Sequence, residues 1–171
     1  MTYGKAWAIE ARSTGQSVGA RMMRKLGLFT AIVIFLAGEA AFAETPETIV
    51  RGIYAGGLTQ SSFSRLRSPA SRAQYFQPGL VKLFAADDRT ENLCIDFAIT
   101  SSGQDYDDKE ITRTLRIETK AGDSRAAVDV RFQNFGEPNH IRYDFVRAGE
   151  RWKIADIASL SHRWRLSKLR C

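Results

Sequence analysis

The stretch "GERWKIADI" (residues 149–157) sets large apolar side chains among charged ones, and it decides the fold of its half of the chain. Trp152 and Ile154 stand two residues apart, whereas Lys153 and Ile157 take the other parity. Successive side chains of a β-strand point to opposite faces of the sheet. The spacing therefore predicts a strand that buries Trp152 and Ile154 on one face, with the other parity toward solvent or a sheet edge.

Three upstream segments alternate in the same way between apolar and polar residues. They are "ITRTLRIET" (111–119), "AAVDVRF" (126–132) and "HIRYDFV" (140–146). The connections "AGDS", "FGEPN" and "AGE" are short and rich in turn residues, which is typical of hairpins. The second half of the chain therefore predicts an antiparallel sheet of about four strands, buried on one face.

The segment from residue 44 to about residue 90 has the sequence signals of helices. Thr45 precedes Pro46, an N-cap residue followed by proline at the first helical position. "SPASRAQYF" (68–76) repeats a Ser-Pro start, and "QPGLVKLFAADDR" (77–89) has apolar residues at helical spacing. Helices followed by a strand meander predict an α+β domain over residues 44–171, in which the helices pack against the apolar face of the sheet.

The order of these elements resembles the nuclear transport factor 2-like superfamily. Trp152, Ile154 and Ile157 match its late-strand pattern Trp-x-Ile-x-x-Ile. A nearer resemblance is to a bacterial secreted family, domain of unknown function 3828, through "YFQPGLVKLF" (75–84) and "SSGQDY" (101–106). The resemblance implies a cone-like fold, in which a curved antiparallel sheet wraps helices around a pocket. The superfamily includes isomerases, dehydratases and non-catalytic binding modules, so the fold does not settle the function.

The N-terminal region has the order of a secretory signal peptide. A basic pair (24–25) precedes the apolar run "LGLFTAIVIFLAG" (26–38), and "AFA" (41–43) follows with small residues at its ends. We predict cleavage between Ala43 and Glu44 and a periplasmic or secreted product. The apolar run of 13 residues is shorter than the roughly 20 that span a bilayer, so we expect no stable membrane insertion after cleavage; the alternative is a retained membrane anchor.

Residues 1–21 do not fit a signal peptide. The stretch is long for the basic region that precedes the apolar run, and it has no clear periodicity. The simplest interpretation is a mis-assigned upstream extension, with translation starting at Met22 or Met23; the alternative is an extended leader. Export exposes Cys94 and Cys171, the only two cysteines, to oxidising conditions. We predict that they form a disulfide, the alternative being two separate thiols.

The formal net charge is +6, and residues 1–43 supply about half of it, with five Lys/Arg against two Asp/Glu. The C-terminal stretch "HRWRLSKLRC" (162–171) is basic around an aromatic residue. It is interpreted as a solvated tail that packs Trp164 and Leu166 onto the sheet, with contact to nucleic acid or anionic lipid as the alternative. Export argues against nucleic acid, so we expect no nucleic-acid partner.

The loop "LCIDFAITSSGQDYDD" (93–108) holds the candidate site residues. Asp96 lies between Ile and Phe, and a carboxylate in apolar surroundings can serve as a general base. Gln104, Asp105 and Tyr106 are candidates for binding a polar ligand at the mouth of a pocket. The structural alternatives are a capping or ion-paired Asp96 and a plain turn at residues 104–106.

The sequence predicts no metal and no cofactor. Counted from Asp105, a calcium loop would need glycine where Glu110 stands, and Lys109 occupies a ligand position. His140 and His162 lack the spacing of zinc ligands. The chain also contains no Gly-x-Ser-x-Gly nucleophile motif.

Three functions remain open at this point. The leading hypothesis is an exported, non-catalytic module that binds a small ligand or an envelope protein. The first alternative is a cofactor-free lyase or isomerase with Asp96 as base, which needs an enclosed pocket. The second alternative is a small inhibitor or immunity-type protein, which would present an exposed patch instead of a pocket.

Overall fold

The computed structural model describes residues 44–55, 59–91 and 93–170. The predicted signal peptide (1–43), the cleavage site after Ala43 and the upstream extension (1–21) lie outside these residues. Within the described part of the chain, no helix combines the length and apolarity needed to cross a membrane.

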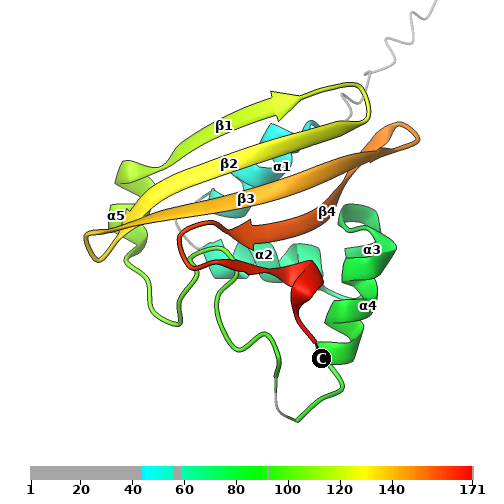
Figure 1. Ribbon diagram of the computed structural model, residues 1–171, viewed down its shortest axis with the longest axis horizontal. Helices are drawn as coiled ribbons and strands as arrows, with labels where there is room; N and C mark the ends of the chain where they lie inside the picture. Colours follow the sequence, from blue (N-terminus) through cyan, green and yellow to red (C-terminus); the bar gives the residue numbers. More distant parts are fainter. Residues whose placement is uncertain (1–43, 56–58, 92, 171) are drawn as a thin grey trace, which may run out of the picture. The chain divides into compact units, whose positions relative to one another are not determined.

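The described chain is an α+β fold, as the sequence predicts (Figure 1). Its helices are α1 (Pro46–Tyr54), α2 (Thr59–Arg67), α3 (Arg72–Tyr75), α4 (Pro78–Asp87), α5 (Asp108–Thr114) and the 3-10 helix η1 (Leu166–Lys168). Its strands are β1 (Arg116–Ala121), β2 (Arg125–Asn134), β3 (Glu137–Ala148), β4 (Arg151–Ser159) and β5 (Trp164–Arg165). The five strands form one antiparallel sheet in the order β1-β2-β3-β4-β5. The fifth strand, only two residues long, was not predicted.

Helix α1 begins where the sequence predicts. The Thr45 side chain accepts a hydrogen bond from the Thr48 backbone N–H at 3.1 Å, and the Thr48 hydroxyl accepts one from the Thr45 N–H at 2.8 Å. This reciprocal capping satisfies two backbone donors that the helix leaves free. The apolar side of α1, with Ile49, Val50 and Ile53, is buried against the sheet. The helix predicted over 77–89 is α4, whereas only the end of 68–76 is helical, as α3.

A β-bulge in β4 corrects the predicted parity of Ile157. Phe145 of β3 pairs with Ile154, but Tyr143, two residues earlier, pairs with Ile157, three residues later. The extra residue on β4 turns Ile157 back to the face of Ile154, and both side chains are fully buried. The prediction that placed Ile157 on the opposite face is wrong. Trp152 is half-buried and packs at the margin of the core.

The prediction of a strand over residues 111–119 is wrong for the first residues of this segment. Residues 108–114 form α5, and the strand β1 begins only at Arg116. The side chain of Asp107 accepts hydrogen bonds from the backbone N–H groups of Lys109 and Glu110, at 2.9 and 3.1 Å, and so starts a helix there. Ile111 still points into the core, because one apolar residue fits the buried side of a short helix as well as that of a strand.

Candidate functional site

Aromatic side chains fill the space between the helices and the sheet, where a cone-fold enzyme would hold its substrate. Phe63, Phe76 and Phe84 pack edge to face with ring centroids 5.0 to 6.3 Å apart. Tyr54 and Tyr143 share a hydrogen bond of 3.1 Å between their hydroxyls, and burial raises the pKa of both. These five side chains are buried. They give the interior of the described chain a structural role.

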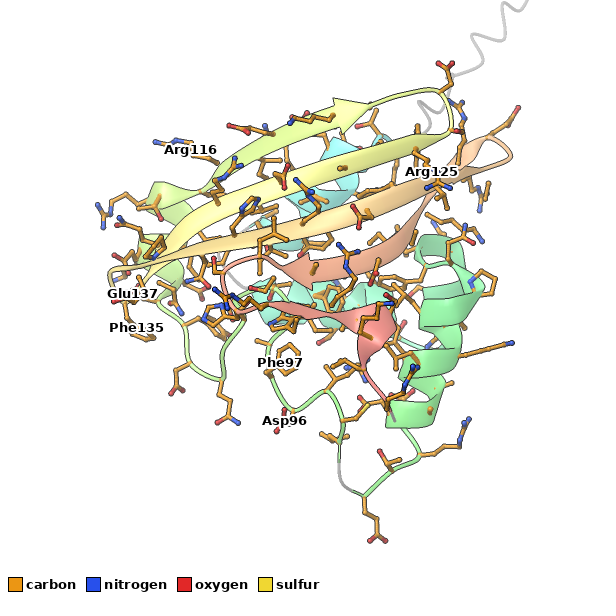
Figure 2. The ribbon with its side chains drawn as sticks, viewed as in Figure 1. Asp96, Phe97, Arg116, Arg125, Phe135 and Glu137 are labelled. Carbon is orange, nitrogen blue, oxygen red and sulfur yellow. The ribbon has the colours of Figure 1, made fainter. Side chains whose placement is uncertain are left out.

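The predicted site residues lie on an exposed loop. Asp96 is exposed and its side chain points away from the core (Figure 2). The apolar surrounding that the general-base hypothesis requires is therefore missing. Gln104 and Asp105 are also exposed, and Tyr106 is half-buried against the core. Asn134 ties this loop to the end of β2, donating from its amide to the Asp105 carbonyl at 3.2 Å, which fits the structural alternative of a turn.

The predicted disulfide cannot be followed to both ends, because Cys171 lies outside the described residues. Cys94 is half-buried, and its backbone N–H donates to the buried carboxylate of Asp87, in the last turn of α4, at 2.9 Å. The C-terminal segment runs along the same helix, since Leu83 and Leu169 line one groove. Cys94 and the C-terminal segment as far as Arg170 therefore both lie against α4, and the bridge stays a prediction.

The basic C-terminal stretch packs onto the sheet, in line with the first interpretation of it. Leu166 is fully buried and Trp164 is half-buried. Arg165 donates to Asp144 at 2.7 Å and to Asp156 at 2.9 Å. This residue is therefore ion-paired with carboxylates of the protein itself.

The outer face of the sheet, turned away from α1 and α2, carries a row of polar residues with internal partners. The register aligns Glu118 of β1 with Asp129 of β2 and Arg142 of β3; we call this the neutralised row. Asp129 accepts two hydrogen bonds from Arg142, at 2.9 and 3.0 Å, and one at 2.8 Å from the ring of His140. Burial acts to raise the pKa of Asp129, but these hydrogen bonds outweigh it, so the pKa lies below its usual value.

The next row toward the β2–β3 turn contains only basic residues. Arg116 of β1 pairs with Arg131 of β2, and Arg131 pairs with His140 of β3; we call this the basic row. Together with Arg113 of α5 it lines a groove of about 530 Å³, and no Asp or Glu is among the described residues that line this groove. Figure 2 shows Arg116 and Phe135 at the same end of the sheet, opposite the end that carries Arg125.

Phe135 occupies the tip of the β2–β3 hairpin at this end. Phe135 and Gly136 form a two-residue turn between β2 and β3, with φ angles of 52° and 78°. Two positive φ values are typical of a type I′ turn, in which Asn-Gly is favoured and a bulky residue is strained. The Phe135 side chain is nevertheless 64% exposed, so burial does not offset that strain.

The β3–β4 hairpin shows that the same sheet closes a turn without strain. Its two-residue turn places Gly149 at a φ of 63°, and glycine adopts this conformation freely. The exposed aromatic is therefore a feature of the β2–β3 hairpin, whereas a positive φ at a non-glycine residue also occurs at Arg163, between β4 and β5. From the sequence, "FGEPN" is predicted only to be a connection between strands; the missed signal is an aromatic residue at a position that favours asparagine.

Comparisons with known proteins bear on the fold. No family model matches the chain, and no curated protein matches it. The solved structures include a match to a chain from the "type VI native effector-immunity complex Tae3-Tai3 from Ralstonia pickettii", with 21% identity and a TM-score of 0.50. The match covers 68% of this chain and 95% of that chain. A selenomethionine form of that complex matches with 20% identity and a TM-score of 0.47.

The likeness shows that this fold occurs in an effector–immunity complex. The resemblance to the nuclear transport factor 2-like superfamily stays a prediction. No group of three His, Cys, Asp or Glu side chains placed to hold a metal ion is found among the residues that the structure describes.

Proposed function

We propose that this protein is an exported, immunity-type module that binds one partner protein and blocks its action. The observation that carries the proposal is Phe135, an exposed aromatic held in the left-handed region at a hairpin tip. Strained backbone is found preferentially at functional sites, and a rigidly presented aromatic is a common anchor of protein interfaces. The aromatic packing between the helices and the sheet adds support, because Phe63, Phe76 and Phe84 occupy this part of the described interior.

The likeness to a chain of an effector–immunity complex supports the immunity alternative over the binding of a small ligand. Export is part of the proposal and rests on the leader sequence. Cleavage after Ala43 would leave Thr45, the N-cap of α1, in the mature chain. N-terminal sequencing of the protein from the periplasmic fraction is expected to begin at Glu44, and a product that retains the leader would contradict export.

The interaction is tested by placing a photo-crosslinking phenylalanine analogue at position 135 in the producing cells. Position 150 is the matched control, since Glu150 is exposed in the other two-residue turn. We expect one protein to be cross-linked from position 135 and not from position 150. Failure to cross-link any protein from position 135 would contradict the proposed site.

The immunity role needs a second measurement. The cross-linked protein, produced alone in a susceptible bacterium, is expected to slow growth, and co-production of this module is expected to restore it. Phe135→Ala is expected to weaken binding by about 30-fold or more, since an interface anchor contributes at least about 2 kcal/mol. A partner without any effect on growth would leave a binding module but would overturn the immunity role.

A further inference from the structure

The basic row breaks a rule of sheet stability. Arg116 and Arg131 are directly paired across β1 and β2, and Arg131 is directly paired with His140 across β2 and β3. Arg116 and Arg131 carry like charges, and like charges directly opposite each other on one face of a sheet repel and destabilise the pair. Local rules of this kind are broken mainly where a function requires it.

The charges of the row are only partly balanced within the protein. Arg131 contacts Glu118 at 2.8 Å, but their side chains are 46% and 63% exposed, so solvent screens the pair. His140 contacts Asp129, which also holds Arg142. The positive charges of the basic row are therefore least compensated by carboxylates at the β1 end of the row.

Arg116 is the least balanced member of the row. Its guanidinium donates one hydrogen bond, at 2.8 Å, to the carbonyl of the preceding residue, Leu115. Across residues 44–55, 59–91 and 93–170, no carboxylate lies within 4.0 Å of it. Its remaining N–H donors are exposed, and a guanidinium binds a carboxylate through two parallel hydrogen bonds.

We propose that the basic row binds carboxylate side chains of an acidic segment on a partner protein. This inference rests on the proposed function and names the chemistry of its partner. Three strands span about 10 Å, enough for two or three carboxylates. The row is bordered by Glu118 and Asp129 on the side away from the β2–β3 turn. These acids would repel a long polyanion and leave room for a short acidic segment that Phe135 could anchor.

The test uses a glutamate-rich synthetic peptide as the probe, with a glutamine-substituted version as its control. Binding to the purified protein is followed by NMR, through the side-chain Nε–H signals of its arginines. We expect the signals of Arg116 and Arg131 to shift with the glutamate peptide alone. Arg116→Ser is expected to lower the affinity for it about tenfold.

Arg125→Ser is the matched control variant, because Arg125 is an exposed arginine of β2 at the opposite end of the sheet. It removes the same charge and is expected to change the affinity less than twofold. Arg116→Lys keeps the charge but not the two parallel hydrogen bonds, and it should give an intermediate loss. Circular dichroism confirms that each variant is folded.

Three outcomes would overturn the inference. Equal losses for Arg116→Ser and Arg125→Ser would mean that binding follows net charge. Tighter binding of a single-stranded oligonucleotide or of anionic vesicles, with the same dependence on Arg116, would assign the row to another class of partner. NMR shifts confined to arginines outside the basic row would show that the peptide does not bind at this row. Peptide binding at the row with no cross-link from position 135 would refute the proposed function while the carboxylate site stands.

Discussion

Two adjacent rows on the outer face of one sheet use charge in opposite ways. In the neutralised row, Asp129 is buried and receives hydrogen bonds from Arg142 and His140. In the basic row, Arg116 faces Arg131 and meets no carboxylate of the described chain. Both rows lie on the same three strands, so the difference in charge balance comes from the side chains. We interpret it as a difference between a structural role and a binding role.

The comparison separates residues that stabilise the protein from residues that are available to a partner. Removing Asp129 leaves a basic side chain without its acceptor, so the protein itself loses stability. Removing Arg116 relieves repulsion, so the protein should gain stability and lose only binding. Opposite signs of the stability change in the two rows are therefore the central expectation.

The largest expected effect is that of Asp129→Asn. Hydrogen bonds to a charged group contribute about 1.5–3 kcal/mol, and Asp129 makes three of them while buried. We expect the free energy of unfolding to fall by about 2–3 kcal/mol in urea denaturation. Glu118→Gln, in the same row but 63% exposed at its side chain, is the control and should change it by less than about 0.5 kcal/mol. Similar losses in the two variants would refute the assignment of Asp129.

A smaller effect should follow from pH. Because the pKa of Asp129 is lowered in the folded protein, its contribution is fully present above the unfolded value of about 3.9 and is lost as pH falls through the folded value. Urea denaturation below about pH 4 should therefore show a steeper loss of stability in wild type than in Asp129→Asn. Parallel curves for the two proteins would show that the carboxylate is not stabilised by folding.

The sequence predicts the strands well where the residue alternation is local. The segments 126–132, 140–146 and 151–157 are parts of β2, β3 and β4, and the Thr45 cap is in place. The bulge in β4 could not be predicted, because it depends on how Ile157 pairs with β3 across the sheet. The helix α5 was missed because the few apolar residues of 111–119 suit either period.

The residues of the candidate site were harder to predict from the sequence than the strands. Residue alternation places Arg116, Arg131 and His140 on outer faces, but only the register brings them into one row. The strain at Phe135 depends on the length of the turn, which is two residues and not the five of "FGEPN". Pro138 lies inside β3, where proline is tolerated because β4 pairs with β3 only from Ile141 on and Pro138 therefore has a single neighbouring strand.

The basic row should respond to Arg116→Glu with a gain in stability. The substitution turns a like-charge pair with Arg131 into an opposite-charge pair, a change of about 0.5–1 kcal/mol in favour of folding. Thermal unfolding at low ionic strength is the measurement, since salt screens the effect. Lys120→Glu is the control, because Lys120 pairs with Ala127 and has no charge opposite it. Loss of stability in Arg116→Glu would show that the row does not repel itself.

The smallest expected effect concerns the backbone at the tip of the β2–β3 hairpin. There too, a feature that costs stability is expected to serve binding. Phe135→Asn places a residue that tolerates positive φ in the first position of the type I′ turn, and we expect a gain of about 0.5 kcal/mol. Gly149→Ala makes the reverse change in the other hairpin, at a φ of 63°, and should cost about 1 kcal/mol. Chemical denaturation of both variants measures the two changes. If Phe135→Asn destabilises the protein, the aromatic ring supports the hairpin and is not held there for a partner. If it stabilises the free protein while weakening the complex, the strain at Phe135 is retained for binding.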